Sequence, residues 1–126
     1  MGKPVAVDGC TLTISSGGSG PAPSVTNSPS SNIKAGGKGV FFKEIKFSVS
    51  GVTAGTITNA DGAGEGTIKG TGSSILENGD KAVLEDDESA LITVNGTMST
   101  PSGPQSASGQ IKVKVSKAGQ SDVIAL

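Results

Sequence analysis

SNIKAGGKGVFFKEIKFSVSG at residues 31–51 and SILENGDKAVLEDDESALITVNG at residues 74–96 follow the same order of polar residues, glycines and apolar residues. The first copy continues to GTIK and the second to GQIK, at the same distance along the chain. Repeats of about 20 to 50 residues are typical of supersecondary units that bury their apolar face only against a neighbouring copy. The sequence therefore predicts an internal repeat, approximately 31–69 and 74–112.

Short runs of alternating apolar and polar residues, separated by Gly, Ser, Asn and Pro, occur along most of the chain. Such alternation is typical of β-strands with one buried face. The clearest run, QIKVKV, puts three apolar residues on one face and two lysines on the other: Ile111, Val113 and Val115 against Lys112 and Lys114. The pattern predicts an all-β fold of small Gly-rich hairpins with little or no helix. One helical turn could begin after Asp80, which is a suitable N-cap.

Glycine makes up 20 of the 126 residues, whereas aromatic residues make up 2%. A core of large side chains is not available from this composition, so backbone pairing and tight turns must contribute much of the stability. Glycine suits turns that need a positive φ and places where two backbones approach closely. We expect structural turns at Gly36, Gly51, Gly79 and Gly96. The Ser-, Pro- and Gly-rich stretch 15–32 is expected to be a surface loop or an extended arm along a partner.

Length, charge and cysteine content narrow the class of protein. A chain of 126 residues has the usual size of one domain, so we expect a single domain over 1–126. The formal net charge of −1 gives no field that would attract nucleic acid or an anionic membrane. The one cysteine, Cys10, cannot form an internal disulfide, and the N-terminal sequence lacks the apolar run of a signal peptide. We therefore expect synthesis in the cytoplasm.

Few residues are suited to catalysis or metal binding. Without His, Tyr or Trp, the usual acid, base and nucleophile sets reduce to carboxylates, Lys and Ser. EDDE at 85–88 is the main acidic cluster, and we interpret it as a solvated turn rather than a catalytic pair. NADGAGEG at 59–66 resembles a calcium loop only weakly, since Gly70 stands where a bidentate Glu is needed. We expect a hairpin turn there, no cofactor, no metal and no enzymatic activity.

Two of the three phenylalanines lie side by side in VFF at 40–42. Adjacent strand residues point to opposite faces, so one ring can enter the core while the other meets a partner. Exposed aromatic residues often anchor interfaces. Burial of both rings and a docking role for one of them remain alternatives. The candidate docking residues are Phe41, Phe42 and Ile45.

The segments GKPVAVDGCTLTISSG, SPSSNIKAGGKGV and ENGDKAVLEDDESA, taken in this order, resemble the PAAR-like proteins that cap the spikes of contractile injection machines. The resemblance implies a pseudo-symmetric cone with approximate threefold symmetry, whose broad base sits on a trimeric β-helical spike, one copy per trimer. It further implies a structural tip that sharpens the spike and helps to pierce the target envelope, with only transient membrane contact and with an effector as an optional cargo. Such a protein would be made in the bacterial cytoplasm and assembled at the tip of a phage tail, a type VI secretion system or a related particle.

The chain departs from the PAAR pattern in two respects. KPVAV at 3–7 is only a loose counterpart of the Pro-Ala-Ala-Arg motif, and the chain has no Arg. Many family members bind zinc near the tip through His and Cys, and this chain has no His and one Cys. We expect no zinc, and Cys10 is expected to be a small apolar residue of the interior. The alternative interpretation is a β-sandwich that binds or decorates the surface of a virion or bacterial particle.

Overall fold

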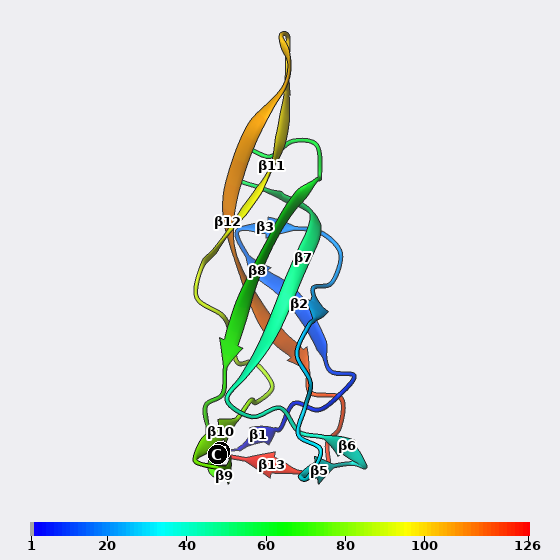
Figure 1. Cartoon of the computed structure of the whole chain (residues 1–126), viewed down its shortest axis with the longest axis vertical. Helices are drawn as coiled ribbons and strands as arrows, with labels where there is room; N and C mark the ends of the chain where they lie inside the picture. The colour runs from blue at the N-terminus through cyan, green and yellow to red at the C-terminus, as the bar shows by residue number, and fades with distance from the viewer. Residues whose placement is uncertain (1) are drawn as a thin grey trace.

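A computed structural model describes residues 2–126 as a tapering body without helices (Figure 1). The predicted all-β, cone-like fold is confirmed. The strands follow in the order β1 (Lys3–Pro4), β2 (Thr11–Ser16), β3 (Gly18–Ser19), β4 (Ser24–Val25), β5 (Lys34–Ala35), β6 (Lys38–Gly39), β7 (Glu44–Ala54), β8 (Gly62–Lys69), β9 (Gly72–Glu77), β10 (Asp80–Ala82), β11 (Ile92–Thr100), β12 (Gly103–Lys117) and β13 (Ile124–Ala125).

The wall of the body is one antiparallel sheet that closes on itself. Its strand order is β2-β12-β11-β8-β7-β3, and β4 also pairs with β7. Because only Gly17 separates β2 from β3, the first and last strands of this order are one bent stretch of chain. Closure of this kind leaves few unpaired strand edges. Residues 2–126 thus form one large sheet and three two-stranded sheets rather than the two stacked sheets of the alternative sandwich fold.

The taper follows from the side chains that point inward. Along β7 the buried residues nearer the base are large, Ile45 and Phe47, and those towards the apex are smaller: Val49, Val52 and Ala54. Near the narrow end, a Cβ on Gly109 would lie 2.5 Å from the carbonyl carbon of Ala54. Glycine is therefore required there, because the opposing walls are in backbone contact. Beyond this level the β7–β8 connection still contacts β11 at Thr97 and Ser99, and the β11–β12 hairpin continues from there to the tip (Figure 1).

Three short segments, 5–7, 40–42 and 82–84, meet near the base in a closed ring of backbone hydrogen bonds. Ala6 N–H donates to Val83 O at 2.8 Å, Val83 N–H to Phe41 O at 2.9 Å, and Phe41 N–H to Ala6 O at 3.0 Å. The flanking residues form three antiparallel bridges, Val5 with Leu84, Val7 with Val40 and Phe42 with Ala82. The ring therefore has the geometry of a threefold arrangement made by one chain.

The ring separates two apolar clusters because neighbouring strand residues point to opposite sides. Its central residues, Ala6, Phe41 and Val83, belong to the upper cluster, which fills the body. The flanking residues belong to or pack against the lower cluster near the base, which contains Val5, Val7, Ala35, Val40, Ala82, Leu84 and Ala125.

The ring defines three structural units, 3–35, 38–77 and 80–125. Each contains a short base strand, a wall segment that rises and returns, and a second short base strand. Val40 bridges Val7, the last residue of the preceding ring segment, and Ala82 bridges Phe42 in the same way, so the second and third units match at an offset of 42 residues. The repeat predicted from the sequence, 31–69 and 74–112, pairs Val40 with Val83, which is one residue out of register, and it does not include the first unit.

Two local expectations also differ from the structure. Asp80 does not cap a helical turn, because it begins strand β10 and pairs with Glu77. The stretch 15–32 is not wholly a loop, since it includes the end of β2 and the short strands β3 and β4. Both short strands pair with β7. The Ser- and Pro-rich stretch thus contributes to the wall of the body.

Candidate docking face

The broad end of the molecule is built from three two-stranded sheets, β5–β6, β9–β10 and β1–β13 (Figure 1). Two of them are hairpins with two-residue turns, Gly36–Gly37 with φ of 59° and 79°, and Asn78–Gly79 with φ of 52° and 84°. Positive φ at both central residues is the type I′ geometry, which fits the twist of a hairpin. The third sheet has the same place in the ring, but it pairs the N-terminal and C-terminal strands.

Each base sheet presents one equivalent pair of residues on its outer side. These pairs are Lys34 with Gly39, Leu76 with Lys81, and Ile124 with Pro4. Their strand neighbours Ala35 and Ala125 are buried in the lower cluster, so the pairs point away from it. We call these six residues the base face.

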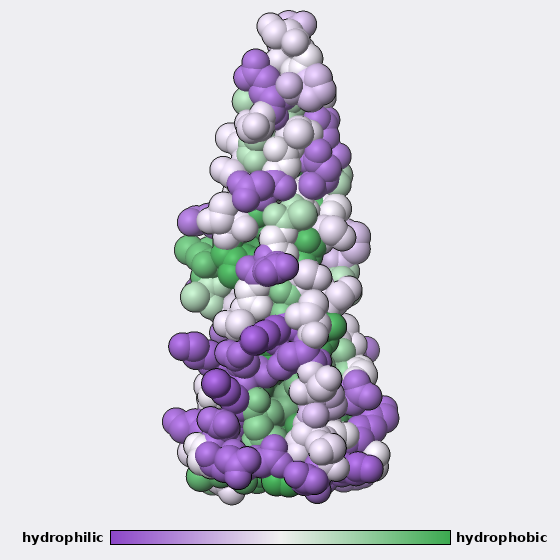
Figure 2. Space-filling model, viewed as in Figure 1, coloured by the Kyte–Doolittle hydropathy of each residue, from purple (hydrophilic) through white to green (hydrophobic). Residues whose placement is uncertain are grey.

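The base face and its border expose large apolar side chains. Leu76 is 51% exposed, Ile124 58% and Leu126 61%, and the fourth large hydrophobic exposed within residues 2–126 is Leu91 at 53%. Hydrophobic and hydrophilic residues lie side by side along the broad end (Figure 2). Scattered single apolar residues on a surface need no explanation, but three gathered at one end point to a contact surface.

The charge on the base face comes from lysines. Lys34 and Lys81 are exposed, and within residues 2–126 neither ammonium group has a carboxylate oxygen within 4.0 Å. Lys3 differs, because its Nζ donates to Asp86 Oδ2 at 3.0 Å. The base face therefore carries positive charge that the protein itself does not neutralise.

The docking residues expected from the sequence lie elsewhere. Phe41 is 2% exposed and Ile45 is 0% exposed, so both belong to the upper cluster and cannot contact a partner. Phe42 is partly buried and packs against the lower cluster. The sequence reasoning missed Leu76 and Ile124. Each of them follows another apolar residue, Ile75 or Val123, and the first unit has Lys34 at the equivalent place, so the sequence pattern does not single them out.

Three of the four expected turn glycines have positive φ. Gly36 and Gly79 lie in the hairpin turns of the base, and Gly51, with φ of 67°, lies at the irregularity in β7 where pairing shifts between Val49 and Val52. Gly96 is not in a turn, because it lies inside β11 opposite Ala107. A Cβ at that position would lie 2.5 Å from Asp61 Oδ1, so close approach explains the glycine.

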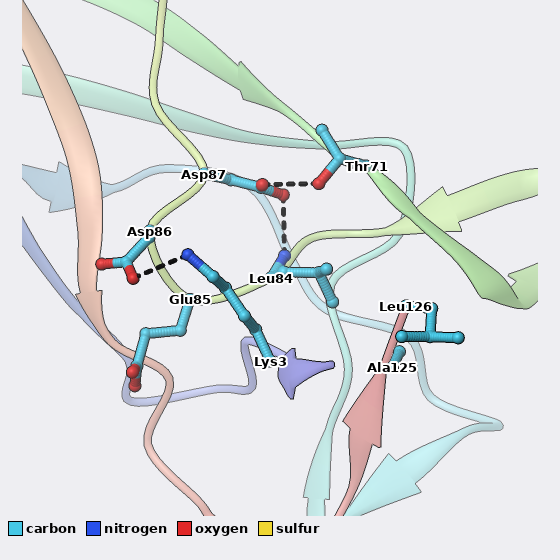
Figure 3. Close-up of a pocket in the computed structure, with 8 residues that line it drawn as sticks. All are labelled: Lys3, Thr71, Leu84, Glu85, Asp86, Asp87, Ala125 and Leu126. Carbon is cyan, nitrogen blue, oxygen red and sulfur yellow. Dashed lines mark hydrogen bonds and ion pairs between the residues drawn. The ribbon is translucent and has the colours of Figure 1, made fainter. Parts of the chain in front are cut away.

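A shallow cavity of about 290 Å³ lies beside the base (Figure 3). Its lining residues are Lys3, Thr71, Leu84, Glu85, Asp86, Asp87, Ala125 and Leu126. Asp86 points at the Lys3 ammonium, and this hydrogen bond lowers the pKa of the Asp86 carboxyl group. Lys114 also lies 4.0 Å from Asp86. The acidic residue is thus held in its charged form by lysines.

Two of the other carboxylates of 85–88, Glu85 and Asp87, hold the backbone in place. Asp87 accepts hydrogen bonds from the Leu84 N–H at 2.8 Å and from the Thr71 hydroxyl group (Figure 3). Glu85 accepts a hydrogen bond from the Ala118 N–H at 3.0 Å. The two side chains therefore point to different partners, and the arrangement supports the interpretation as a structural turn.

The segment 59–66, which resembles a calcium loop weakly, fastens the β7–β8 connection to β11. Asp61 accepts hydrogen bonds from the Thr97 N–H at 2.8 Å and from the Thr97 hydroxyl at 2.6 Å. These bonds lower the pKa of the Asp61 carboxyl group. Asn59 donates to the same hydroxyl at 2.9 Å. Within the part of the chain that the structure describes, no group of three or more His, Cys, Asp or Glu residues is placed to hold a metal ion.

Cys10 is partly buried and packs against the upper cluster. Burial, with a smaller contribution from the charge of Asp8, raises the pKa of the thiol to about 11. A thiol with so high a pKa is a weak nucleophile at neutral pH. The side chain therefore acts as a small apolar residue.

No protein-family model matches the chain, and neither a curated protein nor a solved structure is significantly similar to it. Residues 2–126 contain no helix long and apolar enough to cross a membrane. The case for a function therefore rests on the threefold base, the taper and the residues of the base face.

Proposed function

We propose that this protein is a PAAR-like tip that caps the trimeric central spike of a contractile injection machine. The observation that carries the proposal is the closed ring formed by Ala6, Val83 and Phe41, with three equivalent sheets below it. A single chain has no symmetry of its own. Three matching units give this chain a base with three equivalent sheets arranged around the ring.

A threefold base fits a threefold partner. The end of a symmetric trimer presents three identical sites around its axis. One chain can contact all three sites in the same way if it offers three equivalent surfaces, and the pairs Lys34–Gly39, Leu76–Lys81 and Ile124–Pro4 are equivalent in backbone position. The stoichiometry follows as one copy of this chain per trimer.

The exposed apolar residues provide a driving force for association of the base with a partner. Leu76, Ile124 and Leu126 are each more than half exposed in the isolated chain. Burial of apolar surface is favourable by about 25 cal/mol per Å². Contact through the base would remove these side chains from water and leave the tapering end free.

The rest of the molecule suits a mechanical role. The closed wall has few free strand edges, and the segment NGTMSTPSGPQSASG at 95–109, which forms most of the distal hairpin, contains no charged residue. A narrow tip without charged side chains avoids the largest cost of entering a lipid envelope, since charged side chains are the most costly ones there. Contact with the target membrane would be transient, and no substrate would be turned over. An effector could travel on the flank.

The test is the mass of the complex, measured by light scattering on a sizing column, between this protein and the trimeric spike protein encoded beside its gene. We expect one copy per trimer. Leu76→Asp should abolish the complex, because it places a charge on the base face. Leu91→Asp is the matched control, since Leu91 is 53% exposed against 51% for Leu76 and adjoins Ile92, which pairs with Ile111 in the wall.

Two outcomes would contradict the proposal. The first is the absence of a complex between the wild-type protein and the spike trimer. The second is a complex that survives Leu76→Asp but is lost in Leu91→Asp, because the contact would then be on the flank.

A further inference from the structure

The three base sheets are equivalent in backbone but not in charge. On the base face, the first sheet offers Lys34 and Gly39, the second Leu76 and Lys81, and the third Ile124 and Pro4. Two of the three sheets thus carry one lysine each, at opposite positions of the pair, and none of the six residues is acidic. A partner that covers this face must receive both apolar side chains and ammonium groups.

We propose that each subunit of the spike trimer presents a carboxylate beside an apolar patch, so that the end of the spike is a ring of three carboxylates around an apolar centre. This inference rests on the proposed function and names the chemistry of the partner. Lys34 and Lys81 each meet one carboxylate. The third carboxylate lies beside Ile124 and Pro4 and keeps its contact with water.

The argument for carboxylates is one of desolvation. Covering an ammonium group without a partner is unfavourable because the group loses its hydration, and a neutral apolar end would impose this cost twice. Lys34 and Lys81 have no carboxylate within 4.0 Å among the residues that the structure describes, so any neutralising group must come from the partner. Complementary charge also speeds encounter and fixes orientation.

Lys3, the lysine of the third sheet, does not add a positive charge to the base face. Lys3 is the neighbour of Pro4 and therefore points to the other side of β1, where it forms its ion pair with Asp86 at 3.0 Å. In the ring of equivalent positions, Lys3 corresponds to Lys38 and Asp80, which also lie off the base face. The positive charge is consequently confined to two sectors of a threefold base.

The experiment measures the affinity of the spike trimer for the full-length protein and for two charge reversals, Lys34→Glu and Lys81→Glu, at low and at high salt. Lys46→Glu is the control, because Lys46 is an exposed lysine of β7 on the flank. We expect each base reversal to weaken binding about tenfold at low salt, an effect that shrinks at high salt, and the control to bind as the wild type does. Thermal melting followed by circular dichroism checks that every variant is folded.

The outcomes separate the two proposals. If the wild-type protein binds, Leu76→Asp does not, and both lysine reversals bind as tightly as the wild type at every salt concentration, the spike end is not acidic and this inference is overturned while the cap function stands. If the wild-type protein does not bind the trimer at any salt concentration, the cap function fails and this inference fails with it.

Discussion

Phe41 and Phe42 are neighbours in the chain, yet they lie on opposite sides of the hydrogen-bonded ring. Phe41 is buried among the residues of the upper cluster, and its backbone N–H completes the ring by donating to Ala6. Phe42 packs against the lower cluster and remains partly exposed. The two rings therefore make unequal contributions to stability.

At the scale of single residues, we predict that Phe41→Ala lowers the free energy of unfolding by about 3–5 kcal/mol, because it leaves a cavity in the upper cluster. Phe42→Ala is the matched control and should cost clearly less, since part of that ring already contacts water. Urea unfolding followed by circular dichroism measures both. A larger loss for Phe42→Ala would show that the lower cluster, not the upper one, carries the stability.

The sequence could show that the two rings point apart but not which of them reaches the larger core. Alternation fixes relative direction only. Both sides of 40–42 are apolar, so the choice depends on the ring formed with 5–7 and 82–84, which are distant in sequence. In QIKVKV the sequence does indicate which face is buried, because the opposite face carries lysines. Its apolar residues are all buried, as predicted: Ile111, Val113 and Val115.

The hairpins of the base depend on backbone conformations that glycine adopts easily. Gly37 and Gly79 are the second residues of equivalent turns, with φ of 79° and 84°. A Cβ on either residue would meet nothing within 4 Å. The only cost of a side chain at these positions is therefore conformational.

At the scale of elements, we predict that Gly37→Ala and Gly79→Ala each lower the free energy of unfolding by about 1–2 kcal/mol, the cost of a left-handed residue with a Cβ. Gly79→Asn should cost less, because Asn tolerates this conformation. Thermal or urea unfolding distinguishes the three variants. Equal losses for Ala and Asn at position 79 would mean that the φ angle is not the cause.

The same turns explain why the predicted repeat was one residue out of register. The first turn holds two glycines and the second holds Asn78–Gly79, so a sequence comparison can align Gly79 with either glycine. The predicted repeat pairs Gly79 with Gly36, whereas the pairing of the hairpin strands matches Gly79 with Gly37. The choice between the two glycines depends on backbone pairing, which the amino-acid sequence does not show.

Taken as a whole, the molecule is three units closed into a circle, with the ends of the chain in one base sheet. Lys3 pairs with Ala125 and Pro4 with Ile124. One strand of this sheet, β13, thus comes from the C-terminal part of the chain, whereas the other two base sheets are each formed by strands that follow one another in the sequence. The first unit was not predicted because its wall segment differs: it has the short strands β3 and β4 after β2, where the other two units have the long hairpins β7–β8 and β11–β12.

At the scale of the molecule, we predict that a circular permutant folds. Leu126 and Gly2 occupy the places of Asn78 and Gly79 in the third sheet, so Leu126→Asn joined directly to Gly2, without Met1, creates an Asn-Gly turn. The new ends lie between Gly36 and Gly37. Circular dichroism and urea unfolding should give a cooperative transition like that of the wild type. A permutant opened inside β12, between Ile111 and Lys112, is the control and should fail to fold.

The pairing of β1 with β13 also determines how the molecule responds to force. A pull that separates the two ends acts first on Lys3 and Ala125, the outermost pair, and then on Pro4 and Ile124, so the strands peel apart one pair at a time. A push along the long axis is instead shared by every strand of the closed wall. A pull on the ends therefore acts on only one residue pair at a time, whereas a push loads the whole wall, and a tether fixed next to Lys3 or Ala125 would leave from the broad end.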